Sequence, residues 1–517
     1  MSELSMSGGG VRYGRLALAT VSGAVAVVVS QQIVLSLVVP QLVASLHASP
    51  GDLQWILDSY PIGLAALLLP FGAMGDRWGR RRMLLIGLVG MGAANIAIAM
   101  SDDVASVIVW RCVCAVGAAL VFPATLSTLT SAFPAQRTRA ITTWSIAAIL
   151  GAFAGLFAAG AELEVFSWRS IFWSFGSLSL VLLVAVPLLV PESLASERIN
   201  LDPLGSAVVV LGVGATAFGI VSAGEHGLRS MRVVGAVGVG LVLCAAFLRR
   251  QWLADHPLLD VRALARPVVG VGLVGTTSLF FAVYAAAFIE IEYLAITHGM
   301  SALQIGTTLL SYAPLLLPAI YWSGRVAKRV GAGPFVITGL FVVAATDLLY
   351  ARLDADTTVL AFVGVAALAG GGMGLVQATA TEAIMSALPD AEQGLASAVN
   401  DLTREFGAAL GLAVSGSVLT SHLGTGGTPA TVFMQAWQPT CIWLAGCAAA
   451  CAIAVIPLYR RVVRNRPGGR HAGPRRPSAR RRGNAPGSAG WDVARPVVAA
   501  AGDDRTDRPR RGAARNF

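Results

Sequence analysis

Apolar residues fill most of this chain in long runs that short polar stretches separate. The length of each run is close to or above the roughly 20 mostly apolar residues that a membrane-spanning helix needs. The runs lie at residues 15–46, 53–73, 83–101, 104–132, 139–163, 169–191, 203–223, 231–249, 268–295, 303–323, 334–351, 358–386, 391–421 and 435–459. Backbone groups in lipid must bond internally, and these runs are too continuous for barrel strands. The pattern therefore predicts an all-α polytopic membrane protein with fourteen transmembrane helices.

The composition agrees with this pattern. Of the 517 residues, 55% are hydrophobic and 13% are charged, whereas a soluble domain has about 25% charged residues. The sequence holds no catalytic triad, no zinc-type cysteine spacing and no phosphate-binding loop. We therefore expect neither an enzyme nor a bound cofactor or metal.

The positive net charge belongs to the C-terminal tail. Residues 460–517 hold 16 of the 38 basic residues but only 4 of the 28 acidic ones. The tail is rich in Arg, Pro, Gly and Ala, a composition that predicts disorder. Its arginines are expected to bind anionic lipid headgroups. We expect no nucleic-acid binding, because no aromatic residues interleave with the arginines.

Arginines mark one side of the predicted membrane protein. They occur in alternate loops, at 77–82, 137–139, 249–250 and 325–329, whereas the other loops are acidic or nearly neutral. Loops that remain in the cytoplasm carry the excess of Lys and Arg. Both termini are therefore predicted to be cytoplasmic.

Two segments 252 residues apart repeat one motif. GAMGDRWG at 72–79 aligns with GRVAKRVG at 324–331, and Lys328 stands where the first copy has Asp76. Each copy follows a predicted helix that ends on the arginine-rich side. Such a repeat is typical of transporters built from two related bundles with a binding site between them.

The first copy resembles the signature loop of the major facilitator superfamily. The matching residues are Gly72, Gly75, Asp76, Arg77, Gly79 and Arg80. With residues 53–82 and 387–419, the fourteen spans resemble the fourteen-helix drug:proton antiporters of that family. The nearest likeness is the branch that exports quaternary ammonium compounds and methyl viologen. The resemblance covers about residues 15–460.

The resemblance implies a major facilitator fold, with two six-helix bundles and two extra helices. The expected division is a cytoplasmic tail 1–14, a bundle 15–191, a linker with two helices 192–267, a bundle 268–459 and the tail 460–517. It also implies that the signature loop latches the two bundles together on the cytoplasmic side. We expect Asp76 to face the positive dipole end of the helix that follows it, 83–101.

Two charges lie inside the second and fourth predicted spans. An ionisable group at bilayer depth costs at least ~2.5–3.5 kcal/mol. At a rise of 1.5 Å per residue, Asp58 lies roughly 8 Å and Arg111 roughly 10 Å from the outer edge. The resemblance implies that this acid and this arginine couple proton movement to transport. The alternative is a structural ion pair.

Two spans depart from the family pattern. Gln31 stands where the family usually has an acid, and Leu156 replaces a proline of the antiporter motif in the fifth span. We interpret Gln31 as a substrate contact, with helix packing as the alternative. Gly151, Gly155 and Gly160 are candidates for cavity or gating roles, although small residues also occur wherever helices pack closely.

Further polar residues lie in later spans. Glu290 and Glu292 are 200° apart on a helix, so only one can face a cavity; Glu290 is a candidate for proton or substrate binding. Asp347 is interpreted as structural, at the membrane interface. The thirteenth span supplies further candidates for lining the cavity or forming a gate: Asn400, Asp401 and Arg404.

These features predict a monomeric exporter in the bacterial inner membrane. Its expected substrates are amphipathic, mainly cationic drugs or a self-made antibiotic, driven outward by entering protons through alternating access. One alternative is a transporter of a neutral or anionic metabolite without ordinary proton antiport. The other is a transport-inactive sensor or scaffold that acts through its tail.

Overall fold

A computed structural model describes residues 8–132, 137–192, 202–227, 230–254, 257, 259–386, 388–389, 392–422 and 428–464. Nearly all of these residues are helical and none lies in a strand. The predicted all-α fold is confirmed, and each of the fourteen expected spans falls on a long helical segment. Most of the tail 460–517 lies outside the described residues, but its first five residues continue the last helix.

The chain begins with six long helices, which we call the N-terminal half: α1 (Gly8–Leu46), α2 (Pro50–Trp78), α3 (Arg80–Ala99), α4 (Val104–Ala132), α5 (Arg137–Val165) and α6 (Arg169–Leu189). Two long helices and one short turn follow: α7 (Pro203–His226), α8 (Met231–Leu253) and α9 (Val261–Leu264). The remaining elements make the C-terminal half: α10 (Pro267–His298), α11 (Ala302–Leu309), η2 (Leu310–Tyr312), α12 (Ala313–Val330), α13 (Gly333–Tyr350), α14 (Val359–Met385), α15 (Gln393–His422) and α16 (Pro429–Arg464).

Thirteen stretches of described residues are long and apolar enough to cross a membrane. One of them, Leu303–Val330, combines α11, η2 and α12. The long helix α15 is not among the thirteen, and it carries Asp401, Arg404 and Glu405 close together. It packs against α2, α4, α7 and α10, so its charged middle is surrounded by other helices rather than by lipid.

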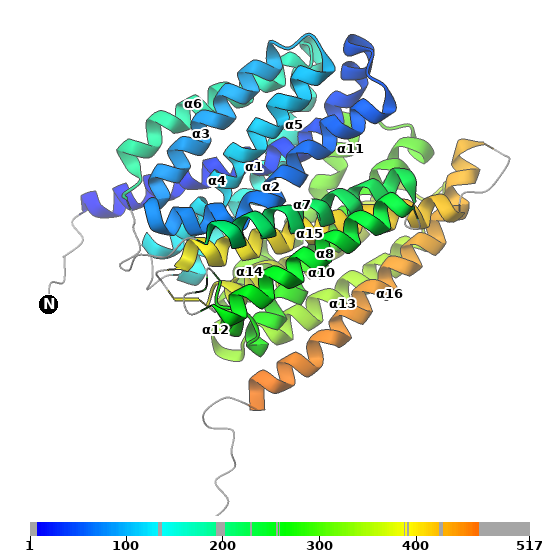
Figure 1. The fold of residues 1–517 in the computed structure, drawn as a ribbon. Coiled ribbons are helices and arrows are strands. Elements are labelled where there is room, and N and C mark those ends of the chain that lie inside the picture. Colours follow the sequence, from blue (N-terminus) through cyan, green and yellow to red (C-terminus); the bar gives the residue numbers. More distant parts are fainter. Residues whose placement is uncertain are drawn as a thin grey trace, which may run out of the picture. The chain divides into compact units, whose positions relative to one another are not determined.

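The buried apolar side chains form separate cores. One core comes mainly from α1–α6 and another from α10–α16. Figure 1 shows the blue to teal helices of the N-terminal half in one part of the molecule and the green to orange helices α10–α16 in another. Helix α7 packs against α2 and α15, and α8 packs against α7.

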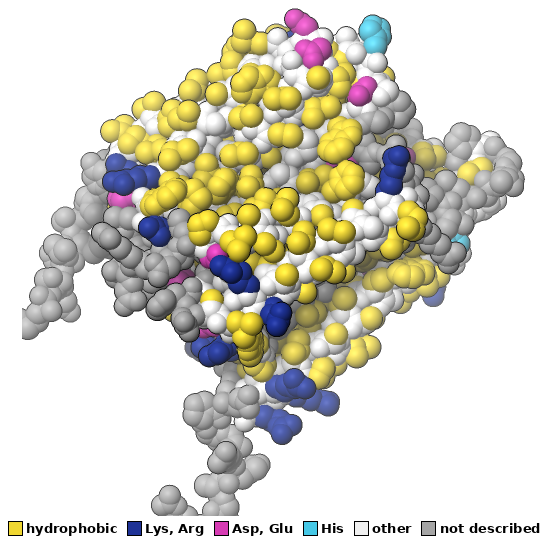
Figure 2. All heavy atoms as spheres, viewed as in Figure 1, with side chains coloured by type: hydrophobic (Ala, Val, Ile, Leu, Met, Phe, Trp, Pro, Cys, Tyr) yellow, Lys and Arg dark blue, Asp and Glu magenta, His cyan; other side chains and the backbone are white. Residues whose placement is uncertain are grey.

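Large apolar side chains cover the outer surface of the helices. Val184 is 64% exposed and Val242 is 68% exposed, as lipid-facing residues are. Figure 2 shows hydrophobic side chains over the helices of one face, with Lys and Arg gathered mainly near the helix ends. The helix ends that carry residues 77–82, 137–139 and 325–329 are called the arginine end below.

A charged pair ties α7 to α8. Arg250 donates hydrogen bonds of 2.8 and 3.0 Å to the carboxylate of Asp202, which in turn accepts from the backbone N–H of Gly205 at the start of α7. The Arg250 hydrogen bonds lower the pKa of Asp202 to about 2. The carboxylate therefore stays ionised throughout the neutral pH range and holds the two helices together at this end.

Candidate functional site

Buried polar residues gather in the middle of α15. Asn400, Asp401 and Arg404 are each 5% exposed or less. The side-chain amide of Asn400 donates to Asp401 at 3.1 Å, and the Ser397 hydroxyl donates to the same carboxylate at 3.4 Å. The three candidates of the thirteenth span therefore form one polar group inside the protein.

Arg404 reaches from α15 to aromatic rings of both halves. Its guanidinium carbon lies 4.4 Å from the ring centre of Phe280 on α10, 5.0 Å from Trp144 on α5 and 5.4 Å from Phe122 on α4. Cations bind aromatic faces at such distances, most strongly where water is absent. We call these three rings the aromatic cage; it holds a cation between the two halves of the chain.

Glu405, beside Arg404, makes a direct hydrogen bond across the halves. Its carboxylate accepts from the side-chain amide of Gln32 on α1 at 2.9 Å. Gln32 was not a candidate from the sequence. The available signal was the position of Glu405 next to Arg404, but nothing in the sequence pointed to Gln32.

Gln31 lies in the interior of the N-terminal half. Its side-chain oxygen accepts from the amide of Asn95 on α3 at 3.2 Å and from the thiol of Cys114 on α4 at 3.0 Å. The residue is 3% exposed. This placement matches the packing alternative for Gln31, whereas its neighbour Gln32 faces the C-terminal half.

Asp58 and Arg111 lie near each other on α2 and α4, and Asp58 attracts the Arg111 guanidinium electrostatically. Arg111 is fully buried, donates from Nε to the carbonyl of Ile56 at 3.2 Å, and stacks 4.7 Å from the ring centre of Tyr60. Asp58 is only partly buried.

The carboxylate of Asp76 binds the start of α15. It accepts from the backbone N–H groups of Gly394 at 2.8 Å and Leu395 at 3.0 Å, and Arg80 donates two bonds to it at 2.6 and 3.0 Å. Arg80 also bonds Ser131 at the end of α4. The sequence placed Asp76 at the start of the helix after it; that expectation is wrong, because Asp76 lies within α2 and caps a helix of the other half.

Glycines of the signature loop permit this contact. A Cβ on Gly72 would lie 2.6 Å from both the Ala398 side chain and the Gly394 carbonyl on α15, so α2 and α15 could not approach as closely. Gly79 has φ +106°, a backbone conformation that glycine adopts readily and that lets the chain turn from α2 into α3. The exposed side chain of Arg77 lies at the same end.

The second copy of the motif lies against the N-terminal half. A Cβ on Gly324 of α12 would lie 2.8 Å from the Thr142 hydroxyl on α5. At the start of α5, Arg137 bonds the Met385 carbonyl at the end of α14 and the Gln393 side chain at 3.0 Å. The arginine end is thus closed by two related contacts, α2 with α15 and α5 with α12 and α14.

The glycines of α5 serve close packing within the N-terminal half. A Cβ on Gly151 would lie 2.6 Å from the Ala26 backbone, and one on Gly155 would lie 2.6 Å from the Ser30 side chain. The Ser30 hydroxyl also donates to the Gly151 carbonyl at 2.8 Å. Gly160, by contrast, faces Leu303 of the C-terminal half, where a Cβ would fit at 3.4 Å.

Glu290 lies apart from the polar group of α15. It is 1% exposed and accepts hydrogen bonds from Tyr312. Asp347, which the sequence placed at the membrane interface, is instead 6% exposed inside the C-terminal half. The hydropathy pattern did not predict this burial, because Asp347 lies only four residues from the end of the apolar run 334–351, where a membrane interface is expected.

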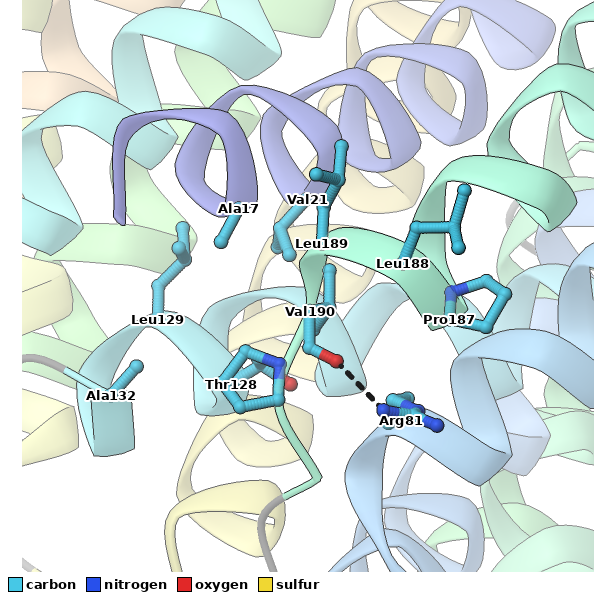
Figure 3. A pocket seen from close by; sticks show the side chains of 11 residues that line it. Ala17, Val21, Arg81, Thr128, Leu129, Ala132, Pro187, Leu188, Leu189 and Val190 are labelled. Atoms are coloured by element: carbon cyan, nitrogen blue, oxygen red, sulfur yellow. Dashed lines mark hydrogen bonds between the residues drawn. The ribbon is translucent and has the colours of Figure 1, made fainter. Parts of the chain in front are cut away.

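An open cavity of about 430 Å³ lies at the arginine end of the N-terminal half, between α1, α3, α4 and α6 (Figure 3). Its wall is apolar apart from Thr128 and Arg81, which donates to the Val190 carbonyl at 3.2 Å. None of the candidate residues lines it.

Known proteins are similar in sequence to this chain over most of its length. Residues 20–202 and 271–501 match the family described as the Major Facilitator Superfamily. The multidrug efflux pump LfrA of Mycolicibacterium smegmatis is 30% identical over 78% of this chain and 81% of its own. The tetracenomycin C resistance and export protein of Streptomyces glaucescens is 28% identical over 74% and 72%. The methyl viologen resistance protein SmvA of Salmonella typhimurium is 29% identical over 75% and 79%.

Solved structures share the fold. The human organic anion transporter MFSD10 (TETRAN) superposes with a TM-score of 0.62 at 15% identity, over 86% of this chain and 99% of its own. An auto-inhibited peptide transporter of the POT family superposes with a TM-score of 0.61 at 17% identity, over 87% and 97%. These likenesses show the fold, and the family match over residues 20–202 and 271–501 shows that the chain belongs to the major facilitator superfamily.

Proposed function

We propose that this membrane protein exports amphipathic, mainly cationic compounds from a bacterial cell in exchange for protons. The observation that carries the proposal is the aromatic cage around Arg404, with Asp401 and Glu405 on the same helix. Rings from both halves already hold an internal cation there, and the same chemistry suits a planar or quaternary cationic drug. The names of the relatives, which refer to multidrug efflux and to resistance, support this class of transport.

The arginine end is proposed to face the cytoplasm, because cytoplasmic loops carry the excess of Arg. The bonds from Asp76 to the start of α15 then form a latch that closes the cytoplasmic side. Opening requires α2 to leave α15, which exposes the buried centre to the cytoplasm. Alternation between the two arrangements moves the substrate outward.

Asp58 and Arg111 are the proposed proton-coupling pair. Asp58 is reachable by a proton, and its charge is stabilised while Arg111 is near. A movement that separates α2 from α4 weakens this attraction and favours protonation. Glu405 provides a further carboxylate on the face shared by the two halves, where it accepts a hydrogen bond from Gln32.

The test is substrate-driven proton flux in everted membrane vesicles, with cationic, neutral and anionic compounds in turn. We expect flux with cationic compounds for the wild type and for Glu164→Gln, whose carboxyl is exposed at the end of α5. We expect a loss of at least about tenfold for Asp58→Asn, because the amide cannot carry the proton.

The other outcomes are equally informative. Undiminished flux in Asp58→Asn would move the proton site to another carboxyl. Flux with neutral or anionic compounds alone would favour the metabolite transporter. No flux from folded protein with any compound would contradict antiport and favour the sensor or scaffold.

A further inference from the structure

A second buried acidic group lies inside the C-terminal half. The hydroxyl of Tyr312 donates to the two carboxylate oxygens of Glu290 on α10 at 2.6 and 2.7 Å. The hydroxyl of Tyr350 on α13 lies 3.3 Å from that of Tyr312 and also bonds Glu290. Two phenols from different helices thus converge on one carboxylate.

The second acid of the group has no such partner. Asp347 lies one turn before Tyr350 on α13 and is 94% buried, as its 6% exposure shows. No described residue donates a hydrogen bond to its carboxylate. It interacts electrostatically with Glu290 and with the Tyr312 hydroxyl. A carboxylate beside another acid, without a donor of its own, is costly to keep ionised unless a partner neutralises it.

No described basic residue supplies that neutralisation. The groups that act on the two acids are Tyr312 from η2, Tyr350 from α13 and each other, and the two acids in turn face the thiols of Cys441 and Cys447 on α16. Toward α14 and α16 the surroundings are aromatic. Tyr293 stacks on Phe362 and Trp437, with ring centres 5.8 and 4.5 Å apart.

Two like charges cannot both persist in such a place. An ionised carboxylate in an apolar interior is very costly unless it is paired, and adjacent acids without a cation share a proton. Hydrogen bonds from two tyrosines stabilise the ionised form of Glu290. Asp347 accepts no hydrogen bond from a described residue.

We propose that Asp347 and Glu290 form a proton-binding site of the C-terminal half, separate from Asp58 and from the polar group of α15. Asp347 holds the proton, and Glu290 with its tyrosines is the acceptor that exchanges it. The presence of the bound proton is independent of the proposed export; only its use in coupling rests on that proposal.

The test is infrared absorption of the full-length protein in lipid nanodiscs at neutral pH, where a protonated carboxyl has its own C=O band. We expect part of this band to be lost in Asp347→Asn. Glu292→Gln, two residues from Glu290 on the same helix and partly exposed, should leave the band unchanged. Asn has nearly the shape of protonated Asp, so the variant should fold.

Three results would overturn the site or reassign it. An unchanged band in Asp347→Asn and in Glu290→Gln would show that neither acid holds a proton. A band that falls when sodium chloride replaces choline chloride would assign the site to a sodium ion. If Asp347→Asn does not fold, Tyr312→Phe serves as the second variant. It removes a hydrogen-bond donor from Glu290, so the proposal requires the C=O band of protonated carboxyls to rise. An unchanged band in Tyr312→Phe would contradict the proposal. Absence of proton flux in vesicles would leave each of these readouts intact.

Discussion

Gln31 and Gln32 are neighbours on α1 whose side chains contact different parts of the protein. Gln31 bonds Asn95 and Cys114 within the N-terminal half, and Gln32 bonds Glu405 of the C-terminal half. We predict that Gln31→Leu lowers the free energy of unfolding by about 1–3 kcal/mol, since Asn95 loses a buried acceptor. Gln32→Leu should leave stability nearly unchanged but alter transport, because Glu405 loses its partner across the halves.

The two variants control for each other. Thermal unfolding in detergent measures the first effect, and uptake of a fluorescent cation into everted vesicles, scaled to folded protein, measures the second. Equal loss of stability in both variants would show that Gln32 is also a packing residue. Loss of transport in Gln31→Leu alone would favour the interpretation of Gln31 as a substrate contact.

At the residue scale, the sequence predicted that several charged residues are buried, but not which residues contact them. Asp401 and Arg404 could be singled out because a charge in an apolar run is conspicuous. The aromatic cage could not, since its rings lie on α4, α5 and α10 and apolar rings occur throughout the chain. Gln31 was preferred to Gln32 from the family pattern, and a single helical position changes the direction of a side chain by about 100°.

At the scale of elements, the contact between α2 and α15 depends on one glycine more than on its neighbour. A Cβ on Gly72 would collide with α15 at 2.6 Å, whereas one on Gly75 would lie 3.8 Å from Met83, an ordinary contact. We predict that Gly72→Ala forces the two helices apart at the arginine end, so the closed arrangement becomes less populated. Gly75→Ala is the matched control and should keep it.

Spin labels on the ends of α2 and α15, in a background without other reactive cysteines, measure this distance. The expected result is a longer or broader distance distribution for Gly72→Ala than for wild type and Gly75→Ala. Identical distributions in all three proteins would mean that the helices accommodate the methyl group and that the glycine is not needed for closure.

Hydropathy was sufficient to predict the helices, but not which of them meet. Each apolar run became a helix because lipid leaves the backbone no other partner. Asp76 was assigned to α3, the nearest helix start in the sequence, yet its carboxylate caps α15, more than 300 residues away. The internal repeat did indicate that the halves are related, and Gly324 accordingly meets α5 as Gly72 meets α15.

At the scale of the whole molecule, the contacts proposed for transport lie among the long helices. The latch, the aromatic cage, the Asp58–Arg111 pair and the Glu290–Asp347 site are formed by residues of α2 to α16, whereas the composition of residues 460–517 predicts disorder. We therefore predict that truncation after Arg464 keeps substrate-driven proton flux within about twofold of wild type, a change below about 0.5 kcal/mol in the activation free energy.

The truncation also separates a pump from a scaffold. A pump should keep its flux and its resistance phenotype at equal membrane abundance, whereas a protein that acts through its tail should lose its phenotype. A matched control exchanges the arginines of residues 470–515 for glutamine, which keeps the length of the tail and removes its attraction to anionic headgroups. If flux falls in the truncation but not in this variant, the length of the tail matters rather than its charge. If it falls in both, lipid binding by the tail supports the transport cycle, and the transport machinery would extend beyond α16.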